Sequence, residues 1–294
     1  MSRQQSTPDL YQSTAHPCPY LPSETAANLL IDPKYSVSSA LYDTLIRNGF
    51  RRNGALFYRP HCPSCRQCQS VRIRVKDFVM NRAFRRTWKR NQDVSMEIRT
   101  LGFREEHFAL YRNYQANRHP GDSMDNPDPE KYQKFMTESG VDSFMMELRI
   151  DKRLLSVSVV DHVGNGLSAV YTFYDPSETR RSPGTLTILH QIELTRSVDY
   201  DNLYLGYWIE DCPKMSYKTQ FGPVEIFDPL SQAWSAPTVR GFWCPRSRLS
   251  VSMIFSTDRS KYLPPVSADS LPATQALSPI TAPGLTLLGR EPLP

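Results

Sequence analysis

Apolar residues recur at helical spacing in several parts of the chain. Leu41, Leu45 and Ile46 share one face of residues 36–48, which predicts a short helix, and Gly49 follows where a C-terminal cap belongs. The same spacing predicts further helices over residues 82–90, 105–117, 129–138 and 184–198, and a short helix over residues 213–221.

Other segments alternate apolar and polar residues, or are apolar throughout, as strands are. Val71, Ile73 and Val75 alternate with Arg72 and Arg74, which predicts a half-buried strand with a basic outer face. We expect further strands over residues 143–150, 154–161, 167–174, 202–209 and 224–227. Consecutive strands followed by strand–helix–strand indicate an α+β fold, with a mixed sheet flanked by helices.

Length and composition suggest two domains and a tail. We expect a basic, cysteine-bearing N-terminal domain over residues 1–100, a second domain over residues 101–258 and a disordered, Pro- and Ser-rich tail over residues 259–294. The net charge of +5 is only mildly basic. The chain has no run of 18 apolar residues and its beginning is polar, so we expect no contact with a membrane and a cytoplasmic location.

Three cysteines, Cys62, Cys65 and Cys68, are spaced C-x-x-C-x-x-C. At this spacing thiolates can reach one metal ion from a tight turn, and a zinc or iron–sulfur centre needs four such ligands. Cys18 is the expected fourth ligand, with His61 or His16 as substitutes. The alternative is a set of separate reduced thiols that line a turn.

Basic residues occupy one face of the helix predicted over residues 82–90. Their offsets of 0, 3, 4, 7 and 8 place all of them on one side, with no acid between them: Arg82, Arg85, Arg86, Lys89 and Arg90. Arginine side chains match phosphate geometry, so this face predicts contact with a nucleic-acid backbone. The alternative is an ordinary solvated helix face.

Two glycine-containing motifs in the second half of the chain are candidate functional sites. A strand ending near Pro176 is followed by a loop that contains Gly184 and then by a helix, whose N-terminus offers N–H groups to a phosphate or an oxyanion. An ordinary strand–helix connection would have the same pattern. In the aromatic strand over residues 204–209, Gly206 suggests that another group approaches the backbone closely.

The segment 118–125 could line a cleft or merely connect two helices.

In order along the chain, these motifs resemble those of the arginyl-tRNA–protein transferase family, in its short bacterial branch of aspartate/glutamate leucyltransferases. The matching segments are Cys18 to Pro22, Cys62 to Cys68, Arg85 to Asn91, Tyr171 to Pro176, Gly184, Leu205 to Ile209, Lys214-Met215, Tyr217-Lys218 and Phe221 to Pro223. The resemblance implies an N-terminal cysteine-bearing domain and a C-terminal GNAT-like acyltransferase domain. Three positions depart from the family pattern: Leu21 replaces a cysteine of the eukaryotic relatives, Gly222 a larger residue and His190 an aromatic one.

The resemblance also implies a reaction and its partners. Leucyl-tRNA would give leucine to the N-terminal amine of proteins that begin with Asp or Glu, and degradation machinery would act on the product, without any organic cofactor. An oxyanion stabiliser is expected at Gly184, with hydrogen-bonding or proton-relay groups at Tyr171, Asp175, Tyr207 and Tyr217. A cation for the acidic side chain of the acceptor is expected among Arg72, Arg74, Arg118, Lys214 and Lys218, and tRNA contact among the five basic residues above.

Four other activities fit parts of the sequence. Arginine could be the donor amino acid instead of leucine. A non-catalytic RNA-binding protein with a zinc knuckle would leave the second half unexplained. An N-acetyltransferase dependent on coenzyme A would need a glycine-rich pyrophosphate loop, and only Gly184 follows the relevant strand. An iron–sulfur redox sensor would have a visible absorbance band.

Overall fold

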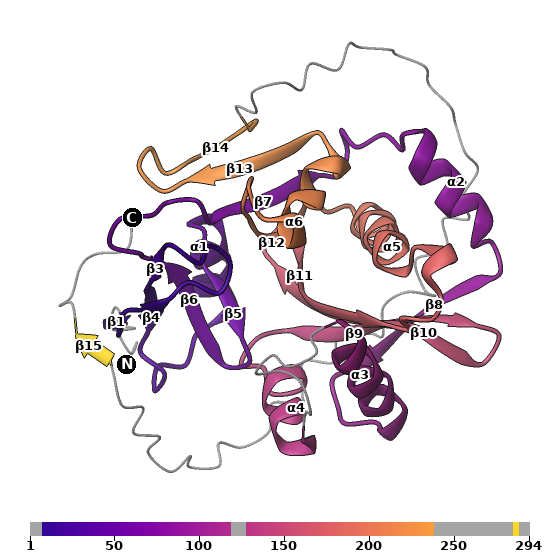
Figure 1. Cartoon of the computed structure of the whole chain (residues 1–294), viewed down its shortest axis with the longest axis horizontal. Coiled ribbons are helices and arrows are strands. Elements are labelled where there is room, and N and C mark those ends of the chain that lie inside the picture. Colours follow the sequence, from indigo (N-terminus) through magenta and orange to yellow (C-terminus); the bar gives the residue numbers. More distant parts are fainter. Residues whose placement is uncertain (1–7, 119–127, 238–284, 288–294) are drawn as a thin grey trace, which may run out of the picture.

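The computed structural model describes residues 8–118, 128–237 and 285–287. These described residues form three sheets (Figure 1). The largest has eight strands in the order β14-β13-β7-β12-β11-β10-β9-β8, the second has five in the order β15-β1-β4-β6-β5, and the third pairs β2 with β3. In the described residues, no helix is long and apolar enough to cross a bilayer.

The eight-stranded sheet contains the core of the molecule. Its strands are β7 (Gln69–Arg74), β8 (Val94–Thr100), β9 (Ser143–Ile150), β10 (Arg153–Val163), β11 (Gly166–Tyr174), β12 (Asn202–Trp208), β13 (Val224–Asp228) and β14 (Ala233–Ser235). Each neighbouring pair is antiparallel except β11 and β12, which are parallel. The sheet is therefore mixed, as the sequence predicts.

Helices cover both faces of this sheet (Figure 1). On one face, α5 (Pro183–Ser197) and α2 (Arg82–Arg90) pack through Leu189, Ile192 and Phe84. On the other, α3 (Glu105–Arg118) and α4 (Pro129–Met136) pack through Phe108 and Tyr132. These contacts and the two-sided burial of β10 confirm the α+β class.

The five-stranded sheet forms a separate layer beside the first, covered by α1 (Ser39–Arg47). Its strands are β1 (Leu10–Ser13), β4 (Asn28–Ile31), β5 (Arg51–Asn53), β6 (Leu56–Pro60) and β15 (Leu285–Leu287). The short pair is β2 (His16–Pro17) and β3 (Thr25–Ala26). Two short 3-10 helices, η1 (Thr179–Arg181) and η2 (Tyr217–Phe221), and α6 (Pro213–Ser216) complete the described elements.

A buried ion pair joins the two larger sheets. Asp161 on β10 accepts hydrogen bonds of 2.6 Å from Nε and Nη2 of Arg52 on β5, and the two side chains are fully buried. Tyr42 on α1 and Ser143 on β9 each donate a hydrogen bond of 2.7 Å to the same carboxylate. Every lone-pair direction of Asp161 is thus engaged across elements of both layers.

The predicted elements are found with small shifts at their ends, and the helix predicted over residues 82–90 has those bounds. The strands β1, β4 and β8 were not predicted. β7 and β8 lie within residues 1–100 and belong to the eight-stranded sheet, so this sheet crosses the predicted domain boundary. The boundary itself stays a prediction. Of the predicted tail, only β15 is among the described residues, where its backbone pairs with β1.

Candidate active site

The parallel strands β11 and β12 separate after a short pairing. They are in register only over three residue pairs, from Gly166 with Asn202 to Ser168 with Tyr204. Beyond these, β11 pairs with β10 and β12 pairs with β7. The carboxyl ends of the two strands are therefore free to present side chains and backbone groups at a common edge of the sheet.

Aromatic rings and one arginine gather at the end of β11. Arg118, at the end of α3, donates a hydrogen bond of 2.7 Å from Nη2 to the hydroxyl of Tyr174, and the Tyr114 ring lies edge-on to that of Tyr174 at 4.9 Å. A Cβ atom at Gly184 would lie 3.2 Å from Cε1 of Tyr174. Glycine thus lets the tyrosine ring lie against the first turn of α5, next to its free amides.

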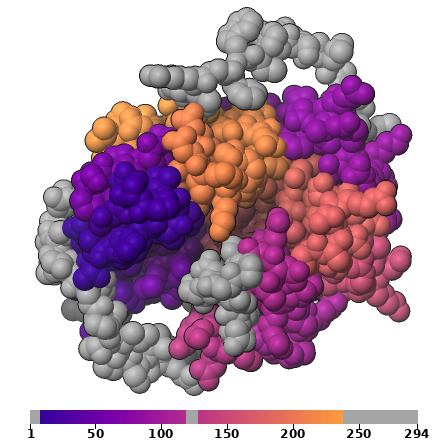
Figure 2. Space-filling view, viewed as in Figure 1, coloured from indigo at the N-terminus to yellow at the C-terminus, as the bar shows by residue number. Residues whose placement is uncertain are grey.

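Tyr217 lies near Tyr174, whereas Tyr171 packs against α3 and α4, beside the rings of Tyr111 and Phe135. Tyr217 is 41% exposed, yet burial raises the pKa of its hydroxyl, and Tyr174 nearby raises it further. Tyr171 accepts a hydrogen bond of 2.9 Å from Nε2 of Gln115, a fully buried residue on α3. In Figure 2 the orange segment that includes α6 lies next to the magenta segment that includes α3 and α4.

Two predicted catalytic residues are engaged in structural contacts. Asp175 forms an ion pair of 2.7 Å with Arg153 and accepts hydrogen bonds from the amide and hydroxyl of Ser177. The Tyr207 hydroxyl donates to the carbonyl oxygens of Gly49 at 2.9 Å and Tyr58 at 3.2 Å, in the N-terminal layer. Burial raises the pKa of Tyr207 well above its usual value. Their catalytic roles stay predictions, which these contacts do not support.

The predicted cations have different surroundings. Arg72 forms an ion pair of 2.7 Å with Glu225 and covers the Trp234 ring at 4.3 Å, and Arg74 pairs with Asp77 at 3.1 Å. Arg118 is exposed beside Tyr174, Lys214 is exposed on α6, and Lys218 is buried. The segment predicted over residues 118–125 lies outside the described residues from position 119 onward.

Lys218 lies beside the backbone of β12. Its Nζ donates a hydrogen bond to the carbonyl oxygen of Tyr207, and a Cβ atom at Gly206 would lie 3.9 Å from this ammonium group. Gly206 has φ +81°, a conformation that favours glycine. This backbone conformation explains the glycine, and the predicted close approach of another group to the Gly206 backbone stays a prediction.

The basic face of α2 is formed as predicted. Arg82, Arg85, Arg86, Lys89 and Arg90 are all exposed, and in the described part of the chain no ion pair involves them. Asn81 caps the helix by accepting a hydrogen bond of 2.9 Å from the Phe84 amide. Two further guanidinium groups, of Arg180 and Arg181, follow in η1, and Arg90 donates to the Arg180 carbonyl.

The opposite side of α2 fixes the helix to the core. Phe84 stacks on Phe221 with ring centroids 4.7 Å apart, and Trp88 lies against His190 at 4.7 Å. Burial lowers the pKa of His190 to about 4, so this imidazole is neutral near pH 7. His190 therefore packs on Trp88 as an uncharged ring.

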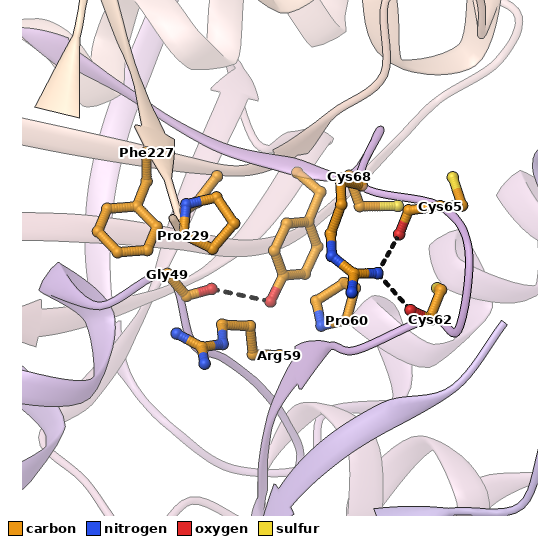
Figure 3. A pocket seen from close by; sticks show the side chains of 11 residues that line it. Gly49, Arg59, Pro60, Cys62, Cys65, Cys68, Phe227 and Pro229 are labelled. Atoms are coloured by element: carbon orange, nitrogen blue, oxygen red, sulfur yellow. Dashed lines mark hydrogen bonds between the residues drawn. The ribbon is translucent and has the colours of Figure 1, made fainter. Parts of the chain in front are cut away.

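The cysteines lie around a pocket between the two layers (Figure 3). Cys62, Cys65 and Cys68 line it together with Tyr207 and Arg66. The Arg66 guanidinium donates to the carbonyl oxygens of Cys62 and Cys65, which holds the turn closed. Burial raises the pKa of the Cys68 thiol to about 12, and the neighbouring thiols of Cys62, Cys18, Cys65 and Cys212 raise it further.

These thiols are of the right chemical type for zinc or an iron–sulfur cluster, and they are close enough to influence one another's ionisation. Among the described residues, however, no group of three or more Cys, His, Asp or Glu side chains is arranged to hold a metal ion. Cys62 instead directs its Sγ to the Ala27 carbonyl at 3.7 Å. The metal centre therefore stays a prediction, and no step of the chemistry below depends on it.

Sequence reasoning missed several residues of this region. Arg51, Tyr114 and Gln115 were not predicted, and Tyr174 was seen only as part of a motif. Arg51 follows a helix cap and precedes a hairpin, where an arginine is usually exposed. No local signal marks it, since Arg51 and its neighbour Arg52 are both buried although adjacent strand residues point to opposite faces.

Comparison with known proteins identifies the family. Residues 16–86 match the family model of the N terminus of arginine-tRNA-protein transferase, and residues 106–228 match the model of its C terminus. The two matches follow one another along the chain. The chain belongs to the arginine-tRNA-protein transferase family, which confirms the resemblance seen in its motifs.

Three bacterial relatives are similar over most of their length, and each is called aspartate/glutamate leucyltransferase. The protein of Nitrosococcus oceani is 46% identical over 228 residues, which are 77% of this chain and 95% of the relative. The protein of Hahella chejuensis is 41% identical, and the match covers 74% of this chain and 92% of the relative. The protein of Chromobacterium violaceum is 43% identical, and the match covers 74% of this chain and 89% of the relative.

Solved structures are less similar. L-PGS from Bacillus licheniformis has a TM-score of 0.40 and 8% identity, covering 49% of this chain and 46% of that one. FemX has a TM-score of 0.39 and 11% identity, and the match covers 68% of this chain and 80% of FemX. Scores this low support no conclusion, so the GNAT-like architecture of the second half stays a prediction.

Proposed function

We propose that this chain transfers leucine from leucyl-tRNA to the N-terminal amine of proteins that begin with aspartate or glutamate. The observation that carries this proposal is the identity of 41–46% with proteins called aspartate/glutamate leucyltransferase, over nine-tenths or so of their length. The strand ends of β11 and β12, with their aromatic and cationic side chains, supply a place for the reaction.

The reaction exchanges an ester for an amide. The neutral amine of the acceptor attacks the ester carbonyl that joins leucine to the tRNA ribose, a C–N bond forms, the C–O bond breaks, and the amine loses a proton while the ribose oxygen gains one. The ester is already activated, and an N-terminal amine has a pKa of about 7.7–8.0, so a good fraction is neutral near pH 7. Positioning of the two substrates can therefore supply much of the rate enhancement.

The oxyanion of the tetrahedral intermediate needs hydrogen-bond donors. Helix α5 begins with Pro183 and has no side-chain cap, so the amides of Gly184 and Thr185 are available to a ligand. We assign the oxyanion to these amides because they are backbone N–H donors at a helix N-terminus. Glycine suits position 184 because a Cβ atom there would crowd the Tyr174 ring that borders the same turn. Tyr171 and Tyr217 are our candidates for passing the proton from the amine to the ribose oxygen.

The donor tRNA needs a basic surface. The five exposed basic residues of α2, with Arg180 beside them, form a face that no carboxylate of the described residues neutralises. We assign the contact with the tRNA backbone to this face.

The product would carry an N-terminal leucine for degradation machinery to recognise. The use of aminoacyl-tRNA indicates a cytoplasmic reaction.

The proposal is tested by transfer of labelled amino acids. Purified protein is mixed with leucyl-tRNA or arginyl-tRNA, each charged with radiolabelled amino acid, and with peptides that begin with Asp, Glu or Ala. We expect label from leucyl-tRNA on the Asp and Glu peptides alone. Label from arginyl-tRNA instead would assign the chain to the arginine-donating activity, and no label on any peptide would refute the proposal.

A further inference from the structure

Two cations are buried next to each other where β12 leaves β11. Arg51 on β5 is 5% exposed and Lys218 in η2 is 8% exposed. The Arg51 cation is close enough to disfavour protonation of Lys218. In the described residues neither of them forms an ion pair with an Asp or Glu. A buried charge without a counter-ion is costly, so two such charges together indicate that an anion is missing.

The hydrogen-bonding capacity of the two cations is only partly used. The ammonium group of Lys218 can donate three hydrogen bonds, and one, to the Tyr207 carbonyl, is formed. Arg51 donates to the carbonyl oxygens of Phe50 at 2.9 Å and Gly206 at 3.5 Å. Its Nε is buried and has no hydrogen-bond partner in the described part of the protein. Donors therefore remain for a ligand.

Open space lies next to the ammonium group. At Gly206, the Lys218 Nζ at 3.9 Å is the one described atom within 4 Å of an added Cβ, apart from the neighbouring residues of the chain. The backbone of β12 changes register against β7 between Tyr204 and Tyr207, and it no longer pairs with β11 there. Tyr217, 41% exposed, lies over Lys218 with the Nζ 5.9 Å from its ring centroid.

We propose that Lys218 and Arg51 bind the side-chain carboxylate of the first residue of the acceptor protein. This inference rests on the proposed function and names the group that reads Asp or Glu. A carboxylate beside Gly206 would give both cations a counter-ion. The exposed guanidinium groups of α2 suit the phosphates of the tRNA, which approach from outside the molecule.

The surroundings of the other cations support this choice. Arg72 and Arg74 already have carboxylate partners, so binding an acceptor would require an existing ion pair to open. Burial, followed by the charge of Arg51, lowers the pKa of Lys218 to about 8. A carboxylate bound beside it would favour the charged form again. Lys218 is therefore expected to be more fully charged when an acidic side chain is bound beside it.

The test compares acceptor peptides that differ only in charge at the first residue. Leucine transfer is measured with peptides beginning with Asp or Asn, at saturating leucyl-tRNA, for wild type, Lys218→Met, Lys218→Arg and the control Lys152→Met, an exposed lysine in the turn between β9 and β10. For Lys218→Met we expect kcat/KM on the Asp peptide to fall about 10- to 100-fold, mainly through KM, as for loss of a charged hydrogen bond. Transfer to the Asn peptide, which lacks the carboxylate, should stay as low as in wild type.

The other variants and a binding measurement complete the test. Lys218→Arg should restore most of the preference for Asp, and Lys152→Met should behave as wild type. The inference is overturned if Lys218→Met keeps the wild-type Asp-to-Asn ratio, or if it loses affinity for tRNA while its KM for the Asp peptide is unchanged. The second result would mean that the missing anion is a tRNA phosphate.

Failure of the proposed function gives a different result. If wild type transfers no leucine to the Asp peptide, calorimetric titration of the same two peptides still tests the site without turnover. Tighter binding of the Asp peptide than of the Asn peptide, lost in Lys218→Met, would support the carboxylate site. Equal binding of both peptides to wild type would refute it. Thermal denaturation of each variant confirms that it is folded.

Discussion

At the scale of single residues, Lys218 is the side chain whose burial is hardest to explain by folding. Its pKa falls from 10.5 to about 8, chiefly because burial disfavours the charged form. For a base this means that folding is penalised below pH 8, where the group is charged in the folded and unfolded chain. The penalty disappears as the pH rises from about 8 towards 10.5, because the unfolded chain then binds more protons.

We therefore expect Lys218→Met to be more stable than wild type at pH 7, by about 1–3 kcal/mol, since a pKa unit corresponds to about 1.4 kcal/mol and a hydrogen bond is lost in return. Urea denaturation at pH 7, 8, 9 and 10 measures this, and the difference should shrink across the series. A variant that is less stable than wild type at pH 7 would show that Lys218 contributes to folding rather than to a ligand.

The same residue shows what the sequence could not predict. Lys218 was one of five candidate cations, and nothing in its local sequence distinguishes it from Lys214 one turn earlier. Arg51 was not a candidate at all. The pair comes together because β5 and β12 meet where the two layers touch, which depends on long-range strand pairing. Likewise Tyr207 looked catalytic in the sequence, but strand alternation directs its hydroxyl to Gly49.

At the scale of elements, α2 is where prediction and structure agree best. Its basic residues recur with helical period and its aromatic residues occupy the other side, so pattern alone defines both bounds and orientation. β8 was missed although Val94, Met96 and Ile98 alternate with polar residues. Its preceding helix ends only a few residues earlier, and a weakly buried edge strand gives a weaker apolar signal than the core strands β9 and β10.

The role of α2 predicts a salt-dependent effect. Replacing Arg86 and Lys89 together by glutamine removes two exposed charges that have no carboxylate partner in the described residues. We expect weaker binding of leucyl-tRNA, and a salt dependence of the binding constant that is shallower by about 1–2 in log–log slope, because fewer counterions are released. Filter binding at several salt concentrations measures both.

Folding should not be affected, because Phe84 and Trp88 fix the helix to the core from the opposite face. Lys152→Gln is the matched control for loss of an exposed charge, and it should leave tRNA affinity and slope unchanged. If the double variant binds tRNA with the wild-type slope, the tRNA surface lies elsewhere on the molecule.

At the scale of the whole molecule, the two layers depend on the ion pair of Arg52 and Asp161. Asp161→Asn keeps the volume of the side chain but leaves the Arg52 guanidinium buried without a counter-charge. We expect a loss of about 3–5 kcal/mol in unfolding free energy. Urea denaturation of Asp161→Asn and of a double variant with Arg52→Met measures it, and the double variant should recover part of the loss. A change below about 1 kcal/mol in Asp161→Asn would contradict this account of the interface.

The cysteine pocket lies between the same two layers, and no residue of the cluster at Tyr174 lines it. Replacing Cys62, Cys65 and Cys68 by serine should therefore lower stability while leaving the choice of donor amino acid unchanged. Thermal denaturation, metal analysis of the same samples and the transfer assay test this together. A triple variant that is metal-free, fully stable and normally active would mean that these cysteines have no structural role, whereas a change of donor would place them in the reaction.

The central claim is transfer of leucine to an acidic N-terminus, and mass spectrometry tests it most directly. Purified protein, leucyl-tRNA and a peptide beginning with Asp are incubated, and the product is sequenced by fragmentation. We predict a peptide longer by one leucine, placed before the aspartate and joined through its α-amine, and no change in the same peptide beginning with Ala. An unmodified Asp peptide, or leucine on the Ala peptide to the same extent, would contradict the account.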